Sequence, residues 1–292
     1  MSSETAIVPP ASPGGLSAQL RAGLLTWPVM LGCAVLLAVI ALALLAPWIS
    51  GYSPTDIDTS QRLKPPTALH WLGTDALGRD IFARVTYGAR QSLVVGLGAV
   101  CISVVIGLVI GVAAGYFRLV DAIAMRVMDG LMAIPGILLA IALVSLSGAS
   151  LFTVLVAISI PEIPRVVRMV RSVILGVRNE SYVEAAVVLG TPVSVIMWRH
   201  MMPSTVAPLI VQGTYIFASA ILTEAVLSFL GAGIPPEIPS WGNIMADGRV
   251  YFMMLPGMIL YPGILVSLTV LSVNVLGDAV RDALDPRMAK RR

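Results

Sequence analysis

The sequence predicts an all-α polytopic membrane protein, and three observations support this fold class: its composition, the length of its apolar segments and the placement of its basic residues. Of 292 residues, 57% are hydrophobic and 12% are charged, and the mean hydropathy is +0.90. A soluble domain does not need so much apolar surface. A bilayer core about 30 Å thick requires roughly 20 helical residues. The apolar segments are too long and continuous for barrel strands of about 10 alternating residues.

Six transmembrane helices are expected from segments with few or no charges. A run at 127–161 carries one charge, is too long for one crossing, and is divided by the small polar residues 147–150 into a hairpin whose second limb continues toward residue 172. The other segments are 28–49, which gives a first span at 27–49, then 91–117, 204–230, which holds only Glu224, and 254–276.

The basic residues place both termini in the cytoplasm. Lysine and arginine gather in the cytoplasmic flanks of membrane helices, and six spans put both ends on one side. With the N-terminus inside, thirteen basic residues lie inside and six outside; the inner ones are Arg21, Arg118, Arg126, Arg165, Arg168, Arg171, Arg178, Arg199, Arg281, Arg287, Lys290, Arg291 and Arg292.

The segments between the spans follow from this orientation. Residues 1–26 are rich in Ser, Pro and Gly and are expected to be a disordered cytoplasmic tail. The extracytoplasmic segment 50–90 could form a helix from about Asp75, with Asp80 and Arg84 paired at i,i+4. We expect an interfacial helix leading into the second span, with a partner-binding surface as the alternative.

A short polar segment within the cytoplasmic region 172–203 interrupts the apolar chain with the sequence SYVEAAVVLGTPVSVIMWRHMMP. Ser181 and Glu184 fit a capping box, and Gly190 suits the left-handed end of the helix that follows. Thr191 and Pro192 suggest a second N-cap with proline at the first helical position. Two short helices joined by a tight bend are predicted.

A two-turn helix is marginal alone in water and needs a surface to pack on. Ala185 and Ala186 keep the first helix slim, so that another surface can approach its backbone. The helix could pack on the protein's own cytoplasmic helix ends or dock on a separate cytoplasmic protein, and the residues alone leave both open.

Several catalytic classes find no support in the sequence. The chain has two lysines, Lys64 and Lys290, and neither follows the G-x-x-x-x-G-K-[ST] loop that ATP hydrolysis would need. The two histidines are far apart, and Cys33 and Cys101 lie in apolar spans, so no metal or redox site is expected. We predict a non-catalytic chain without a cofactor of its own, and ATP would be handled by another polypeptide.

Three acidic residues within or beside the spans keep an ion-coupled transporter or channel as the rival class. Asp129 and Glu162 are expected near cytoplasmic ends, paired with Arg126 and Arg165. Glu224 lies deeper. It could hydrogen-bond a neighbouring helix, or line a translocation pathway together with Ser228.

The sequence resembles the C-type permease subunit of bacterial dipeptide, oligopeptide and nickel ABC importers. Glu184-Ala185-Ala186, Gly190 and Pro203 look like the EAA loop of such permeases, and the stretches WLGTDALGRDIFARVTYGARQSL, LTEAVLSFLGAGIPPEIPSWGNI and DALDPR sharpen the likeness. The resemblance covers about residues 28–287 and makes 91–292 the permease core.

The resemblance implies a type I ABC importer permease fold and a docking role for the cytoplasmic segment. The coupling helix would bind a groove of the ATPase subunit through Glu184, Ala185, Ala186, Gly190, Tyr182 and Leu189. The implied partners are a second homologous permease, one or two nucleotide-binding subunits that hold ATP and Mg, an extracytoplasmic substrate-binding protein and membrane lipid, with no nucleic acid. The implied place is the bacterial cytoplasmic membrane, and peptides are the expected cargo.

Two further segments complete the predictions. The external loop 231–253 is rich in Pro and Gly. Trp241 and Tyr251 could lie at the headgroup level, or the loop could contact the binding protein through Trp241, Glu237 and Asp247, as the resemblance implies. The cytoplasmic tail 278–292 is expected to be solvated, with lipid contact as the alternative.

Overall fold

The computed structural model describes residues 26–284, and the predicted tail at 1–26 and the last residues of the tail at 278–292 lie mostly outside that range. The described chain is helical, with one isolated β-bridge between Thr74 and Asp80. Its α-helices are α2 (Trp27–Ile49), α3 (Ile81–Tyr116), α4 (Arg118–Met132), α5 (Gly136–Ser147), α6 (Leu151–Ser159), α7 (Ile163–Val177), α8 (Ser181–Val188), α9 (Val193–Val195), α10 (Val206–Phe229), α11 (Trp241–Gly248) and α12 (Gly257–Leu284).

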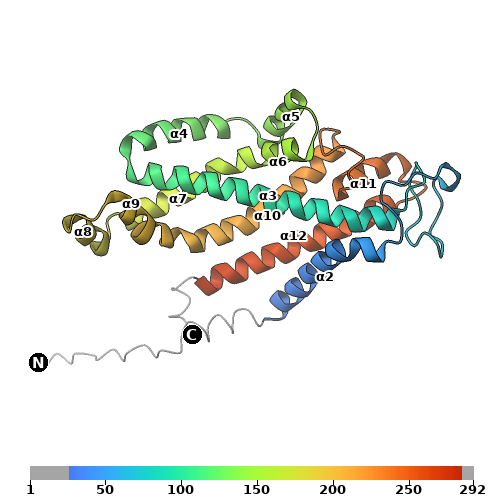
Figure 1. Cartoon of the computed structure of the whole chain (residues 1–292), viewed down its shortest axis with the longest axis horizontal. Helices are drawn as coiled ribbons and strands as arrows, with labels where there is room; N and C mark the ends of the chain where they lie inside the picture. Colours follow the sequence, from blue (N-terminus) through green and yellow to red (C-terminus); the bar gives the residue numbers. More distant parts are fainter. Residues whose placement is uncertain (1–25, 285–292) are drawn as a thin grey trace, which may run out of the picture.

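Short turns of other helix types connect some of these elements. They are η1 (Thr59–Gln61), η2 (Ile160–Glu162), η3 (Ile196–Met201, a π-helix), η4 (Met202–Thr205) and η5 (Arg249–Tyr251). The long helices run lengthwise through the molecule (Figure 1). The segment α8–α9 lies at one end of the bundle, and α11 lies with the 50–80 segment at the other.

Four helical segments are long and apolar enough to cross a membrane: Trp27–Ile49, Ile81–Tyr116, Val193–Phe229 and Gly257–Ala283. A fifth candidate is the pair α4 and α5, which is bent by 89°. The helical run from α6 through η2 to α7 is continuous from residue 151 to 177. The structure thus supports an all-helical protein with four or five apolar spans in the described residues, and six transmembrane helices stay a prediction.

The predicted hairpin turn at residues 147–150 is present. Helix α5 ends at Ser147, Gly148 takes a φ of +82°, and the Ser150 side chain accepts a hydrogen bond from the Thr153 amide to begin α6. The small polar residues therefore end one helix and cap the next.

The predicted helix start at Asp75 is wrong, because α3 begins at Ile81 with Asp80 as its N-cap. Residues 75–79 form a tight turn closed by the amide of Asp75 donating to the carbonyl of Arg79. The expected Asp80–Arg84 pair does not form either. The Asp80 carboxylate binds the Ala83 amide and the ring of His70, so it is already occupied.

Helices α3 and α7 pack closely through three glycines spaced four residues apart on α3. A Cβ at Gly107, Gly111 or Gly115 would lie 2.5 to 2.7 Å from side-chain atoms of Val166, Val170 or Ile174, respectively. The residue numbers on both helices increase in the same order along the contact, so the two helices run parallel. Small residues at this spacing let membrane helices approach at backbone distance. The largest buried cluster lies here, shared with α6 and α10.

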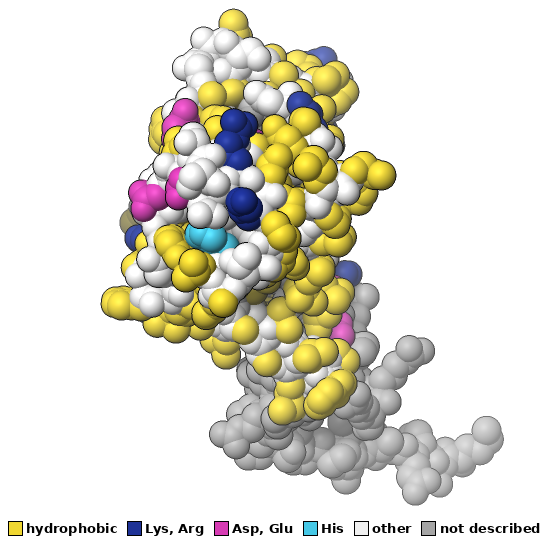
Figure 2. Space-filling view, turned by 90° about the vertical axis from the view of Figure 1, so that its right-hand side faces the viewer, with side chains coloured by type: hydrophobic (Ala, Val, Ile, Leu, Met, Phe, Trp, Pro, Cys, Tyr) yellow, Lys and Arg dark blue, Asp and Glu magenta, His cyan; other side chains and the backbone are white. Residues whose placement is uncertain are grey.

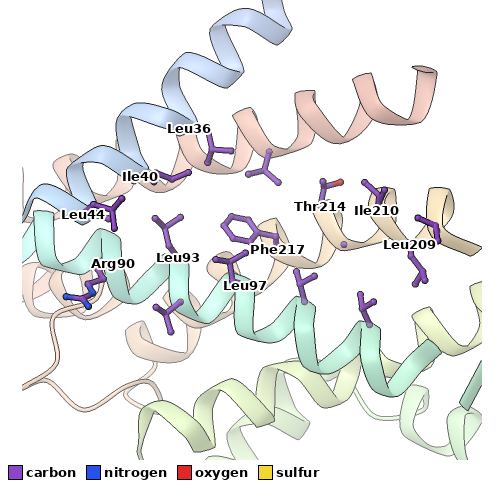
Figure 3. Close-up of a pocket in the computed structure, with 17 residues that line it drawn as sticks. Leu36, Ile40, Leu44, Arg90, Leu93, Leu97, Leu209, Ile210, Thr214 and Phe217 are labelled. Carbon is purple, nitrogen blue, oxygen red and sulfur yellow. The ribbon is translucent and has the colours of Figure 1, made fainter. Parts of the chain in front are cut away.

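Helix α10 separates this core from a cavity of about 760 Å³ on its other side. The cavity lies among α2, α3, α10 and α12, and Figure 3 shows side chains from these helices pointing into it. Leu36, Leu93, Leu97 and Phe217 are typical of its lining. Apart from Arg90 and Thr214, the side chains are apolar, so this side of α10 suits acyl chains or other apolar groups.

Candidate functional site

Helix α8, in the segment predicted to be cytoplasmic, begins one residue earlier than the capping box predicts. Glu180 is the N-cap of α8, and its carbonyl accepts from the amides of Val183 and Glu184. Ser181 is already helical, and no side-chain cap hydrogen bond forms. The turn after α7, in which the Glu180 amide binds the Val177 carbonyl, leaves Glu180 extended at φ −77° and ψ 140°. The capping-box prediction is therefore wrong.

The end of α8 follows the prediction. Leu189 is the C-cap and Gly190 takes a φ of +72°. The Gly190 amide binds the Val187 carbonyl and the Thr191 amide binds the Ala186 carbonyl, which is the Schellman pattern. The bend therefore leaves few carbonyls unsatisfied.

The second short helix starts one residue later than expected. Pro192 is its N-cap rather than its first helical residue, and its carbonyl accepts from the amides of Val195 and Ile196. Thr191 is used instead to close the preceding bend. The helix then widens into the π-helix η3, which carries Trp198, 70% exposed. Such π-helical turns are frequent at functional sites.

One face of α8 packs on the protein and the other stays exposed. Val183 and Ala186 are buried in the cluster that contains Ile196 and Met201. Of the expected docking residues, only Ala186 thus faces inward. The exposed ones are Tyr182, Glu184, Ala185, Leu189 and Gly190.

Sequence reasoning missed Val187 and Val188, which directly precede the expected docking residue Leu189. Val188 and Leu189 are 86% and 83% exposed at the tip of α8, beside Val187 at 53%. The apolar run before Gly190 was the available signal. A tip with large exposed apolar side chains is typical of a protein-contact site. The packing of α8 on the protein itself is therefore observed for Val183 and Ala186, and docking on a separate protein stays a prediction.

The opposite end of the bundle is held by a buried network of charges. The Asp75 carboxylate accepts from Arg79 Nε and from Arg84 Nη1, both at 2.6 Å, and the Asp247 carboxylate accepts from Arg84 Nη1 at 3.0 Å and Arg79 Nη2 at 3.2 Å. Figure 2 shows basic and acidic side chains among hydrophobic ones on the surface of this end, whereas Arg84 and Asp75 of the network are buried. The network ties the 50–80 segment to α11.

The two acids of this network differ in their surroundings. Asp75 is 1% exposed at its side chain and Asp247 34%. Burial alone would raise the pKa of Asp75, but the charges of Arg84 and Arg79, with hydrogen bonds from Arg79, outweigh it and lower the pKa. Asp75 is thus held ionised as a structural anchor, while Asp247, a predicted binding-protein contact, remains accessible.

The loop 231–253, predicted to be external, folds inward around Trp241. The Trp241 side chain is fully buried, and its Nε1 donates to the Val85 carbonyl at 3.1 Å. Its predicted place at the headgroup level is therefore wrong, and its side chain does not reach the outer surface for a binding-protein contact. Asn243 Nδ2 donates to the carbonyls of Ile234, Pro235 and Ile238. Glu237, on the same loop, is exposed.

Glu224 and Ser228 lie next to each other inside the protein. Glu224 is fully buried, and its Oε1 accepts from Ser228 Oγ at 2.7 Å and from Ser240 Oγ at 2.8 Å. Ser240 is also the N-cap of α11. The expected hydrogen bond to a neighbouring element is confirmed. Whether Glu224 or Ser228 meets substrate stays a prediction.

The other two acidic residues predicted within or beside the spans pair with arginines. Glu162 pairs with Arg165 as predicted. Asp129 binds Arg168 Nη2 at 2.6 Å, so its predicted pairing with Arg126 is wrong. No group of three or more metal-ligating side chains occurs within residues 26–284.

Comparison with known proteins adds the family. Residues 103–290 match the model described as binding-protein-dependent transport system inner membrane component, and residues 28–66 match the N-terminal TM domain of oligopeptide transport permease C. The chain is 54% identical over 264 residues to a probable peptide ABC transporter permease of Sinorhizobium fredii, covering 90% of each protein. It is 42% identical over 260 residues to a dipeptide transport system permease of Alkalihalophilus pseudofirmus, covering 89% of this chain and 86% of that one.

A relative with a different named cargo is also similar. The chain is 40% identical over 254 residues to a glutathione transport system permease of Pectobacterium atrosepticum, covering 86% of this chain and 84% of that one.

Proposed function

Because the chain belongs to the family of binding-protein-dependent transport system inner membrane components, we propose that it is one of two non-identical permease subunits of an ATP-driven importer for di- or oligopeptides. The family match over residues 103–290 carries this proposal. The peptide cargo is supported by the names of the relatives, which transport peptides, dipeptides and glutathione. Substrate would move by alternating access.

Six crossings and two cytoplasmic termini form part of the proposal. To the four apolar helices we add the bent pair α4–α5 and the run from residue 151 to 177. The last run holds Glu162 and several arginines, which explains why it does not qualify by hydropathy alone. The excess of basic residues supports this orientation in a bacterial cytoplasmic membrane.

The exposed side of α8 is proposed to dock on an ATPase subunit. Its apolar tip, Val188 and Leu189, would enter a groove, with Glu184 and Tyr182 at the rim. Apolar side chains at the centre of a contact and polar ones around it are the usual arrangement of a protein interface. One or two such subunits would hold ATP and Mg, so this chain needs no cofactor of its own.

The outer end is proposed to receive the substrate-binding protein through Glu237 and Asp247. Both carry accessible carboxylates on the loop that Trp241 and Asn243 hold in place. The rival class, an ion-coupled transporter using Glu224, loses its support because the relatives are ABC transporter permeases. The contacts of Glu224 with Ser228 and Ser240 give it a structural role between α10 and α11.

The test is copurification of the assembled transporter. A tag at the C-terminus, mild solubilisation of native membranes and mass spectrometry should recover a second permease and one or two P-loop ATPases, and the loaded binding protein would identify the cargo. A chain that emerges alone or as a homo-oligomer under several mild detergents would contradict the proposal.

A further inference from the structure

An ion pair lies halfway along the helix bundle, where a charge is most costly in a membrane protein. Arg165 Nη1 donates to both carboxylate oxygens of Glu162, each at 3.0 Å. Ser219 Oγ on α10 donates to Glu162 Oε1 at 3.2 Å, and Tyr215 Oη on the same helix lies 3.3 Å from Arg165 Nη1. The Glu162 side chain is 9% exposed and that of Arg165 46%.

Contacts with the neighbouring helix α3 fix the depth of this pair. Ser103 Oγ donates to the Ser159 carbonyl, and Gly107 lies against Val166, so Glu162 lies level with residues 103–107 of α3. The uncharged stretch of α3 and its C-cap runs from residue 91 to 117, and its middle is residue 104. The prediction that Glu162 lies near a cytoplasmic end is therefore wrong, because the helical run continues to Val177.

Polar side chains line the exposed side of the bundle next to this pair, while one turn or more further along α10 Leu222 and Val226 are exposed on the same face. On α7, Arg165, Arg168 and Ser172 are exposed and share one helix face. On α10, Tyr215 is exposed, and Gln212, Ser219 and Thr223 are partly exposed at helical spacing. The two stripes meet at the contacts of Arg165 with Tyr215 and of Glu162 with Ser219.

The opposite side of α10 is apolar, since Leu209, Gly213 and Phe217 line the cavity described above (Figure 3). Charged and polar side chains at bilayer mid-depth face a protein interior or a water-filled path rather than lipid. The polar side of α10 and α7 is therefore the side that water or a passing solute touches, and the apolar side is the one suited to lipid.

We propose that Arg165, held by Glu162 and Tyr215, binds the carboxylate of the peptide as it passes the middle of the membrane, and that the polar stripes of α7 and α10 form the pathway wall. This inference rests on the proposed function. The guanidinium makes its hydrogen bonds to described residues through Nη1 alone. Its Nε and Nη2 thus remain free for a carboxylate, which such a planar fork binds through two parallel hydrogen bonds.

The first experiment tests whether the polar stripes line a water-filled pathway, and it does not depend on which substrate is carried. In the assembled transporter with Cys33 and Cys101 replaced by serine, Tyr215→Cys should react with a charged, membrane-impermeant methanethiosulfonate reagent. Leu97→Cys, whose parent side chain is 58% exposed on the apolar side, should not. Equal labelling of the two variants, or an unreactive Tyr215→Cys both with and without a non-hydrolysable ATP analogue, would overturn the pathway assignment.

The second experiment tests the carboxylate. Uptake of a radiolabelled dipeptide and of its C-terminal amide is measured in proteoliposomes, each supplied at a concentration that saturates the binding protein. Arg165→Gln should reduce the maximal uptake rate of the free acid about tenfold, as expected for loss of a charge-assisted contact, and leave that of the amide unchanged. Arg165→Lys should recover part of the rate.

The matched control is Arg178→Gln, at the exposed C-cap of α7 and outside the polar stripes, which should preserve the wild-type difference in maximal uptake rate between the free acid and the amide. If the Arg165→Gln transporter retains the wild-type difference in maximal uptake rate between the free acid and the amide, the assignment of Arg165 to the peptide carboxylate is overturned. So would loss of the second permease from purified Arg165→Gln, which would assign Arg165 to subunit contact. A wild-type transporter that imports neither peptide would instead contradict the proposed cargo and leave the labelling result standing.

Discussion

Arg84 and Asp247 are 163 positions apart in the sequence, and their side chains meet at 3.0 Å. Arg84 is 1% exposed and also binds Asp75, which is equally buried. The arginine thus joins the first turn of α3 to the 50–80 segment on one side and to α11 on the other. Removing it would leave a buried carboxylate without this partner.

Arg84→Met should therefore destabilise the protein strongly. Breaking a buried ion pair by removing one partner typically costs about 3–5 kcal/mol. Asp247→Asn, at a carboxylate that is 34% exposed, should cost no more than about 1 kcal/mol. Thermal unfolding of the purified transporter in detergent would rank the variants, and an Arg84→Met midpoint equal to that of Asp247→Asn would contradict the role of the network.

The same network should give the stability of the α11 end of the bundle a specific pH dependence. The folded-state pKa of Asp75 is lowered below its ordinary value of 3.8, so its contribution to stability is complete above that value and is lost as the pH falls through the lower, folded-state pKa. When thermal unfolding is measured between pH 3 and pH 7, the unfolding temperature of Asp75→Asn should fall less on acidification than that of wild type. Asp56→Asn, at an exposed position, should follow wild type.

Gly190 should be essential for coupling rather than for insertion. Its φ of +72° strains any other residue, by about 1–2 kcal/mol for alanine, and proline cannot adopt it at all. Gly190→Pro is expected to insert and assemble, while ATP hydrolysis continues without peptide uptake, and Gly190→Ala should lie between it and wild type. The measurement is uptake per ATP hydrolysed in proteoliposomes.

Gly176→Ala is the matched control, since a Cβ there meets nothing within 4 Å and the backbone is helical. It should keep the wild-type ratio of uptake to hydrolysis. Normal coupled uptake by Gly190→Pro would remove the mechanical role of the bend.

Gly111 should tolerate no side chain. A Cβ there would lie 2.7 Å from Val170 Cβ and 2.9 Å from the Val167 carbonyl oxygen. Overpacking of this kind costs about 1–3 kcal/mol, so Gly111→Ala should unfold at a lower temperature than wild type. Gly130→Ala, where a Cβ has open space, should be neutral or slightly stabilising. Equal unfolding temperatures for the two variants would refute the tight contact.

Features set by local chemistry could be predicted from the sequence. The absence of charge over 28–49 predicts the position of α2, and the small polar residues at 147–150 predict the break between α5 and α6. Gly190 predicts the end of α8, because a left-handed C′ residue favours glycine.

Features set by distant contacts could not be predicted. Trp241 has the ring of a headgroup anchor, yet the Val85 carbonyl satisfies its N–H inside the fold. The capping-box pattern at Ser181 is overridden by the turn that leaves α7, which makes Glu180 the cap. The sequence places Glu162 near a cytoplasmic end with Arg165 close by, and only the packing of α7 against α3 reveals its depth.

The parallel packing of α7 on α3 has a mechanical consequence. Helix α7 has 15 residues and is about 22 Å long at 1.5 Å per residue. One end joins α8 through a three-residue turn, and the other carries Arg165. The glycine contacts press this rod against α3 along its length, so a push on α8 cannot be absorbed by bending within α7. We expect it to arrive at mid-membrane as a displacement of Arg165, so that a force applied at the proposed docking helix acts on the residue proposed to bind the peptide.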